Sequence, residues 1–136
     1  MNYLLDTNSV VALLRGKPAE VREHYREAAA AGHSFAISSI VLFELWCGVE
    51  KSTLVAENRE RLRILLSGNL DLLAFDDEDA ESAGAVRAAL EQSGTPIGAY
   101  DLLIACQALQ RGLTVVTANS GEFNRVPGLS CVDWTV

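Results

Sequence analysis

The sequence has few cysteines, little positive charge and no long uncharged apolar run. Its three cysteines, Cys47, Cys106 and Cys131, are an odd number at wide spacing, without a Cys-x-x-Cys or Cys/His ligand pattern. Zinc binding and a disulfide framework are therefore not indicated, and each thiol is expected to be a small core side chain. No apolar stretch reaches the roughly 20 residues of a membrane helix, and the first residues do not resemble a signal peptide. These absences predict a protein of a reducing compartment, the cytoplasm, with no membrane partner.

The shortage of positive charge limits the kind of partner. There are 11 Lys and Arg against 18 Asp and Glu, a net charge of −7. A protein this acidic does not hold nucleic acid through its bulk charge. If the substrate is a polyanion, another group must supply positive charge at the site.

Apolar runs typical of strands alternate with helical segments along the whole chain. Strands are expected over 3–5, 34–37, 70–75, 113–116 and 130–133, and helices over 10–14, 18–31, 40–50, 54–66, 76–92 and 101–110, with one further helical turn near Glu122. This alternation predicts one α/β domain over residues 1–136 with a mostly parallel central sheet. Ligands bind such sheets beyond the carboxyl ends of the strands, so the residues that follow the strands are the functional candidates.

Two carboxylates lie where a strand ends or a helix begins. Asp6 directly follows the first expected strand. It could simply cap the next helix, although Asn8 and Ser9 could do so equally well. Asp101 opens a mostly apolar helix, where an acidic residue also suits the helix dipole. Each position therefore has an ordinary structural interpretation beside the functional one.

Glu44 interrupts a helix whose other residues are apolar on every side. A helix of this kind is expected to be buried, and an unpaired buried carboxylate costs several kcal/mol. Glu44 must then have a cation, a hydrogen-bond network or a raised pKa. An internal salt bridge, for example to Arg15, is the structural alternative.

A polar segment, Thr117 to Asn119, follows the fourth expected strand, and Glu122 comes shortly after it. An ordinary turn would explain these residue types. If the segment converges with Asp6, Glu44 and Asp101, the clustered carboxylates need bound cations or protons. Oxygen ligands without His or Cys select Mg2+ or Mn2+. Such an ion would let an acidic protein hold a phosphodiester and activate a water molecule to attack it.

Four motifs, in order and at matching spacing, carry a resemblance to a known family. They are Tyr3-Leu4-Leu5-Asp6-Thr7-Asn8, the segment 38–52 around Glu44, Ile97-Gly98-Ala99-Tyr100-Asp101, and Val116-Thr117-Ala118-Asn119 with the segment 122–129. With these motifs the chain resembles PIN-domain ribonucleases, in particular VapC-type toxins of toxin–antitoxin pairs, over nearly its whole length. The resemblance implies a three-layer α/β/α fold.

The same resemblance implies a set of site residues. Asp6, Glu44 and Asp101 would be metal ligands and, with Asn119, catalytic residues. Thr7, Asn8 and Thr117 would support the ligands or contact the scissile phosphate. The family often has an acid where this chain has Asn119, so a second metal site would be weaker here unless Glu122 compensates.

The resemblance also implies partners. These are a single-stranded or looped RNA substrate, a second copy of the chain in a homodimer, and a small antitoxin protein that assembles with the toxin into a larger complex. The antitoxin would place a helix or an extended tail, sometimes with an Arg, into a groove near the acidic site.

Few side chains are available to contact RNA. The basic candidates for the edge of the active site are Arg15, Lys17, Lys51, Arg111 and Arg125, although a solvated surface position is the favoured expectation for them. Trp46 and Tyr100 could stack on bases, but core packing is the favoured expectation because both neighbour apolar residues.

Two other functions compete with the metal-dependent endoribonuclease. In a phosphotransfer protein, Asp6 would be a nucleophile at a strand end. Haloacid dehalogenase-like phosphatases require a second Asp where this chain has Asn8, and a suitable Lys is not evident. A catalytically silent PIN-like module that only binds a partner is the second alternative, and Asn119 favours it.

Overall fold

Five short parallel strands form the central sheet. The computed structural model describes residues 2–136. Its strands are β1 (Asn2–Leu5), β2 (Ser34–Ser38), β3 (Leu70–Leu73), β4 (Thr114–Val116) and β5 (Ser130–Val132). Their order across the sheet is β3-β2-β1-β4-β5, and each pair of neighbours is parallel. The predicted strands and their parallel arrangement are therefore confirmed.

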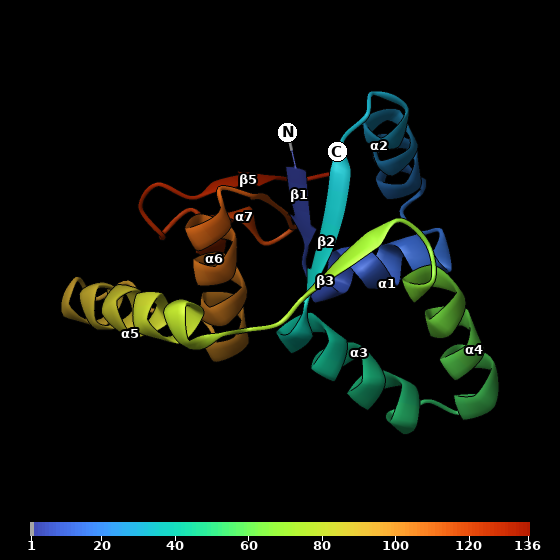
Figure 1. Cartoon of the computed structure of the whole chain (residues 1–136), viewed down its shortest axis with the longest axis horizontal. Helices are drawn as coiled ribbons and strands as arrows, with labels where there is room; N and C mark the ends of the chain where they lie inside the picture. Colours follow the sequence, from blue (N-terminus) through green and yellow to red (C-terminus); the bar gives the residue numbers. More distant parts are fainter. Residues whose placement is uncertain (1) are drawn as a thin grey trace.

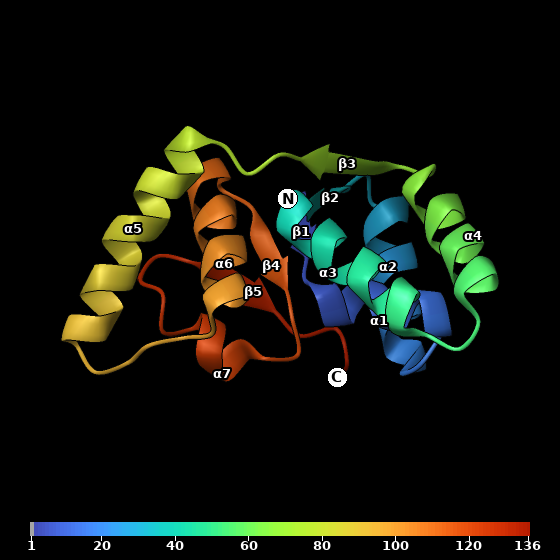
Figure 2. The same ribbon diagram turned by 90° about the horizontal axis from the view of Figure 1, so that it is seen from below.

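Helices on both sides of the sheet complete a three-layer α/β/α domain (Figures 1 and 2). They are α1 (Thr7–Arg15), α2 (Ala19–Ala30), α3 (Ser39–Lys51), α4 (Val55–Leu66), α5 (Asp77–Gln92), α6 (Ala99–Arg111) and the short α7 (Ser120–Phe123). Helix α5 packs against α6, and α3 contacts α1, α4 and α6. None of the helices in residues 2–136 combines the length and the apolar character that a bilayer crossing requires.

Local capping explains where several helices begin. The hydroxyl of Ser38 accepts a 3.0 Å hydrogen bond from the Ile40 N–H at the start of α3. Asp76 and Asp79 form a reciprocal capping box at the start of α5. Helix α6 begins two residues before the predicted start, because the Leu102 N–H already donates to the Gly98 carbonyl at 2.9 Å.

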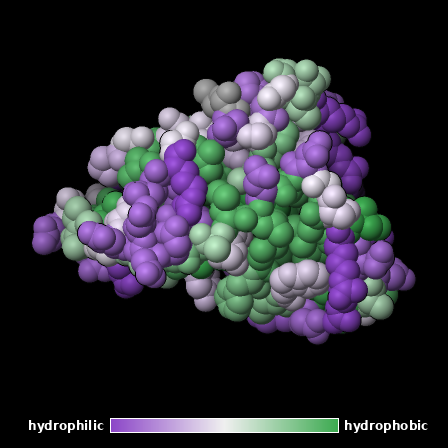
Figure 3. All heavy atoms as spheres, viewed as in Figure 1, coloured by the Kyte–Doolittle hydropathy of each residue, from purple (hydrophilic) through white to green (hydrophobic). Residues whose placement is uncertain are grey.

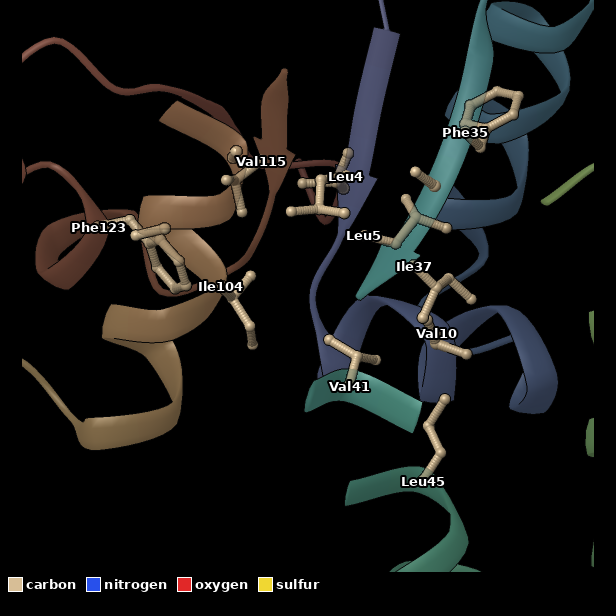
Figure 4. Packing of buried hydrophobic residues seen from close by; sticks show 14 of the residues in the cluster. Leu4, Leu5, Val10, Phe35, Ile37, Val41, Leu45, Ile104, Val115 and Phe123 are labelled. Atoms are coloured by element: carbon tan, nitrogen blue, oxygen red, sulfur yellow. The ribbon is translucent and has the colours of Figure 1, made fainter. Parts of the chain in front are cut away.

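The hydrophobic core fills the space between the sheet and its helices (Figure 4). Leu5 from β1, Ile37 from β2 and Val115 from β4 are fully buried. Ile104 of α6 and Phe123 of α7 close the core over these strands. Burying one side chain of this kind contributes about 1.5–3 kcal/mol, so the core fixes the strand ends that carry the polar residues.

The cysteines meet the core expectation only in part. Cys106 is buried, whereas Cys47 and Cys131 are partly exposed, and within residues 2–136 all three are free thiols. Burial raises the pKa of Cys106 to about 11. This thiol is therefore an unreactive core group.

An ion pair joins α5 to α6. The Asp79 side chain is fully buried, and Arg111 Nη1 lies 2.5 Å from its Oδ1. Arg111 Nη2 also lies 3.4 Å from Asp76 Oδ2. Burial alone would raise the pKa of Asp79, but the hydrogen bonds from Arg111 and from the Asp76 backbone outweigh it and lower the pKa. Arg111 is thus a structural residue, neither the solvated surface side chain favoured from the sequence nor a residue of the active-site edge.

Candidate active site

The strand order places a switch point between β1 and β4. The chain runs from β1 towards β2 and β3 on one side, and β4 and β5 lie on the other side. Crevices at such points, beyond the carboxyl ends of the strands, are the usual ligand sites of open α/β sheets. Asp6 follows β1, and its N–H donates to the carbonyl of Val116, the last residue of β4, at 3.1 Å. The first motif and the Thr117–Asn119 segment therefore meet at this crevice.

Asp6 is positioned both to cap a helix and to offer an oxygen to a ligand, the two roles that the sequence allows. It is the N-cap of α1, and its Oδ1 accepts a 2.8 Å hydrogen bond from the Ser9 N–H. The side chain is only 5% exposed. Its other oxygen, Oδ2, has no hydrogen-bond partner among residues 2–136. One oxygen thus orients the carboxylate and leaves the second available to a ligand.

Glu44 lies on a helix that is less buried than expected. Helix α3 buries Val41, Leu45 and Val49, whereas Phe43 is exposed and Glu44 itself is half-buried. The prediction of a helix buried on every side is therefore wrong. No residue of the described part of the chain forms an ion pair with Glu44, and the suggested salt bridge to Arg15 is absent. Instead, the Thr7 hydroxyl donates a 2.8 Å hydrogen bond to Glu44 Oε1.

Asp101 lies in the first turn of α6, and its pKa is sensitive to the other carboxylates of the site. Burial, and then the charges of three neighbouring carboxylates, raise its pKa to about 6. In decreasing order of effect, these neighbours are Glu122, Asp6 and Glu44. Asp101 therefore lies near all the other acidic candidates, in an environment of uncompensated negative charge.

Glu122 occupies the side of the cluster that faces α6. It accepts hydrogen bonds from the Gly98 N–H and, at 2.6 Å, from Asn119 Nδ2. These two contacts, in that order, lower the pKa of Glu122. A side chain at Gly98 would bring a Cβ within 3.2 Å of Glu122 Oε1, so the glycine permits this close approach. The turn near Glu122 thus carries a fourth acidic residue, whose position the sequence left open.

Asn119 bridges two carboxylates. Its Nδ2 lies 2.6 Å from Glu122 Oε2 and 3.5 Å from Asp101 Oδ2. Since both neighbours are hydrogen-bond acceptors, the amide must turn its N–H groups towards them. Asn119 therefore offsets negative charge within the cluster, and its oxygen points elsewhere.

The remaining predicted residues divide into supporting and accessible groups. Thr117 is fully buried, and its hydroxyl accepts the Asn119 N–H at 2.9 Å, which favours a supporting role over contact with substrate. Thr7 supports Glu44 by donating a hydrogen bond from its hydroxyl to the carboxylate. Asn8 is exposed at the mouth of the site. Sequence reasoning treated Ser9 only as a possible cap, yet its N–H orients Asp6 and its hydroxyl donates to Val116 O at 2.9 Å.

The donor set fits a hard divalent cation. Asp6 Oδ2, Glu44 Oε2 and Asp101 Oδ1 are carboxylate oxygens without hydrogen-bond partners in residues 2–136. As the side chains lie, no three His, Cys, Asp or Glu residues of this part of the chain are arranged to hold one ion. Mutual repulsion keeps carboxylates apart when no cation is present. The residue types and the unused oxygens thus suit Mg2+ or Mn2+, and binding would require the side chains to move together.

The aromatic and basic candidates also have definite positions. Tyr100 is 48% exposed and touches the 56% exposed Phe43 edge-on, with ring centroids 5.8 Å apart, so the favoured core position of Tyr100 is wrong. Trp46 packs against the core and is partly buried, as expected. Arg125 Nη1 donates to Pro96 O at 2.7 Å. Lys51 is exposed at the end of α3.

Comparison with known proteins agrees with this architecture. A family model described as PIN domain matches residues 3–129. The "tRNA(fMet)-specific endonuclease VapC" of Salmonella typhimurium is 39% identical over 134 residues, covering 98% of each chain. "Ribonuclease VapC2" of Rickettsia felis is 40% identical over 134 residues, again covering 98% of each. Among solved structures, a chain of VapBC2 from Rickettsia felis bound to a promoter DNA fragment has a TM-score of 0.90 at 39% identity, covering 98% of this chain and 99% of that one. DNA-bound VapBC from Salmonella typhimurium has a TM-score of 0.88 at 39% identity and covers 98% of both chains.

Proposed function

This chain belongs to the PIN-domain family, and we propose that it is a VapC-type endoribonuclease, the toxin of a toxin–antitoxin pair, with Mg2+ as its cofactor. The observation that carries the proposal is that Asp6 and Glu44 lie near enough to Asp101 for their charges to raise its pKa, beside the switch point of the sheet. A purely structural cap or salt bridge would not require three carboxylates from three motifs to share one crevice. An RNA substrate would place the chain in the cytoplasm, as its sequence predicts.

Mg2+ would be held by the unused oxygens of Asp6, Glu44 and Asp101, and Mn2+ could replace it. When bound, the cation would neutralise charge on the phosphate oxygens and make water a stronger nucleophile at neutral pH. Glu122 supplies a further carboxylate beside Asp101, while Asn119 supplies hydrogen-bond donors in place of a ligand charge. An amide in place of a fourth or fifth carboxylate favours one strong metal-binding site over two sites of equal affinity.

The other residues of the chain orient these groups. The Ser9 N–H fixes Asp6, and the Thr7 hydroxyl fixes Glu44. Positioned donors of this kind keep carboxylates in one orientation, which lowers the cost of assembling a metal site. Exposed Asn8 is placed to contact the phosphate or ribose of a bound RNA.

A transfer RNA is the first substrate to test. The Salmonella relative is named a tRNA(fMet)-specific endonuclease, and its similarity extends over nearly all of both chains. We therefore propose a structured RNA with an exposed single-stranded loop as the substrate class of this chain. Bases in such loops are unstacked and open to a protein surface, unlike bases in a helix.

The antitoxin is proposed to dock in a groove of about 360 Å³ between α1, α3 and α4. Apolar side chains of Val11, Leu14 and Leu45 line it, together with Thr7 and Glu44 of the site. An amphipathic helix can place its apolar face in such a groove, and a cation on that helix would be attracted to the carboxylates. Solved relatives are toxin–antitoxin complexes, which supports this kind of partner.

A homodimer is proposed through the apolar face of α3 and α6. Phe43 and Tyr100 are exposed there, and Trp46 and Leu103 lie three residues further along the same helices. In Figure 3 hydrophobic residues gather on this side of the molecule, in the area where Figure 1 shows α3. A contiguous exposed apolar patch is typical of a protein interface.

Cleavage by purified protein tests the proposed activity. Wild-type protein with Mg2+ should cut a tRNA containing a single-stranded loop, and EDTA should stop the reaction. Asp6→Ala and Asp101→Ala should lose cleavage while keeping their fold by circular dichroism, because each removes a proposed ligand. Asp71→Ala is the matched control, since Asp71 is exposed on the edge strand β3. Cleavage at the wild-type rate by either ligand variant would refute the assignment.

The silent binding module remains the alternative, favoured by Asn119 in a position where the family often has an acid. Calorimetric titration with Mg2+ or Mn2+ separates the two functions. The nuclease should bind the ion in the absence of antitoxin, and Asp101→Ala should abolish the binding heat. A chain that binds RNA but neither ion would be a silent module.

A further inference from the structure

A second groove is lined by residues that closely follow Asp6 in the chain, and none of its lining residues belongs to α3. It has a volume of about 280 Å³ and lies between α1 and the segment after β5. Asn8 and Ser9 line it beside Asp6, and Ala118 lines it from the loop after β4. Arg15 and Lys17, at and just after the end of α1, also line it. We call this surface the basic groove.

The charged residues that line the basic groove are mainly positive, although the chain as a whole is negative. Two cations and one carboxylate, Asp133, line it, whereas the chain carries a net charge of −7. Asp133 Oδ1 already accepts hydrogen bonds from the Thr135 N–H at 2.8 Å and hydroxyl at 2.5 Å. Arg15 and Lys17 form no ion pair or side-chain hydrogen bond with any of residues 2–136. Their charges are therefore free to meet an external anion.

The distance of Arg15 and Lys17 from the carboxylates is suited to a polymeric ligand, which can span it. Arg15 ends α1, whose N-cap is Asp6, so at about 1.5 Å per residue the two lie some 13 Å apart along the helix axis. An extended nucleic acid strand is long enough to contact both the carboxylates and Arg15 across this distance. Asn8 and Ser9 connect the two regions along one continuous lining.

We propose that the basic groove holds the RNA backbone on one side of the scissile phosphate, with Arg15 and Lys17 contacting phosphates. This inference rests on the proposed nuclease function and adds the path of the substrate. Arg15 also lines the apolar groove assigned to the antitoxin, whereas Lys17 lines only the basic groove. Lys17 is therefore the residue that separates RNA binding from antitoxin binding.

The salt dependence of RNA binding tests the proposal without requiring cleavage. A fluorescein-labelled single-stranded oligouridylate is titrated with the protein in EDTA, and anisotropy is followed over a range of KCl concentrations. The slope of log K against log salt is negative, and each lost phosphate contact should make it less steep by about 0.7 for a single strand. Lys17→Gln should thus make the slope less negative by about 0.7, and Arg15→Gln with Lys17→Gln by about 1.4.

The matched control removes the same two charges elsewhere. Arg26 and Arg63 are exposed and lie outside the basic groove. The double variant Arg26→Gln with Arg63→Gln should keep the wild-type slope. Equal slopes for the groove variant and this control would overturn the proposal, and so would groove variants that weaken only antitoxin binding.

Steady-state cleavage in Mg2+ gives an independent readout. Because a backbone contact away from the reacting atoms acts equally on bound substrate and transition state, Lys17→Gln should raise KM and leave kcat within about twofold. A fall in kcat at unchanged KM would contradict the proposal. If wild-type protein fails to cleave RNA but the slope changes persist in EDTA, the nuclease assignment fails while the basic groove stands as an RNA-binding surface.

Discussion

Thr7 donates a 2.8 Å hydrogen bond from its hydroxyl to Glu44 Oε1, joining two residues that lie 37 positions apart in the chain. Thr7 is the first residue of α1, and Glu44 lies in the middle of α3. The contact gives the half-buried glutamate a neutral donor where a salt bridge was the structural expectation. Glu44 thus has no cationic partner among residues 2–136, and its second oxygen is unused, as a cation ligand requires.

Removing this donor should weaken the site without removing a ligand. Thr7→Val has nearly the same shape but no hydroxyl, and we expect cleavage activity to fall about 10- to 100-fold, as is common for residues that orient metal ligands. Thr7→Ser keeps the hydroxyl and should retain most of the activity. Activity is measured as kcat/KM over a series of Mg2+ concentrations. Equal activity of the Val and Ser variants would show that the hydrogen bond does not matter.

Asn119→Asp tests the role of the bridging amide. The change removes the donor between Glu122 and Asp101 and adds a negative charge, so metal-free protein should lose about 1–3 kcal/mol of unfolding free energy. Mg2+ should then stabilise the variant more than it stabilises wild type. Thermal unfolding in EDTA and in excess MgCl2 gives both quantities.

Asn69→Asp is the control for charge alone, because Asn69 is exposed in the turn before β3, at the opposite end of the strand from the crevice. Its response to Mg2+ should equal that of wild type. An Asn119→Asp protein with unchanged stability in EDTA would mean that the amide does not offset the carboxylate charges.

Arg111→Gln should destabilise the fold in a pH-dependent way. The variant leaves the buried Asp79 carboxylate without its cation, and we expect a loss of about 3 kcal/mol at neutral pH. Pairing with Arg111 lowers the pKa of Asp79, so its contribution to stability is complete above the unfolded pKa and disappears as the pH falls through the lowered one. The difference between variant and wild type should therefore shrink below about pH 4.

Urea unfolding at several pH values measures this difference. Arg87→Gln is the control, since Arg87 pairs with Glu91 on the exposed face of α5 and should cost no more than about 0.5 kcal/mol. A constant difference for Arg111→Gln across the acid range would argue against the buried ion pair as its cause.

Phe43→Glu should prevent the proposed dimer from forming. A charge introduced in the centre of an apolar interface is desolvated without a partner, so the variant is expected to sediment as a monomer where wild type sediments as a dimer. Ile64→Glu introduces the same charge at another exposed apolar residue, on α4 away from Tyr100, and should leave the dimer intact. Sedimentation velocity at several concentrations distinguishes these outcomes.

The fold was predictable because local signals and the sheet pattern agree. The apolar run over 113–116, of which Thr114–Val116 forms the buried strand β4, needed no tertiary information. The positions of Asp6, Glu44 and Asp101 raised a shared site only as a condition, because each residue also had a structural interpretation. Parallel strands bring their carboxyl ends to one edge of the sheet, so adjacency there follows from topology.

The sequence could not fix how side chains pair across elements. Glu44 was expected in a buried helix, but whether α3 is covered depends on its neighbours in space and on any partner chain. Arg111, at a helix end, was expected on the solvated surface or at the edge of the site, yet the packing of α5 on α6 directs it to Asp79. The bridge from Asn119 to Glu122 depends on a helix of four residues, for which pattern signals are weak.

The residues of the site are attached to elements that are expected to differ in mobility, because β1 is the central strand of the sheet. Asp6 is attached to the strand that has a hydrogen-bonded neighbour on each side, whereas Asn119 and Glu122 belong to the short α7 and the loop before it. Amides of a central strand exchange with deuterated solvent mainly through global unfolding, while those of a short peripheral helix exchange through small local openings. We therefore expect Asp6 to keep its position when an ion or phosphate binds, and the segment that carries Asn119 and Glu122 to adjust around the bound group.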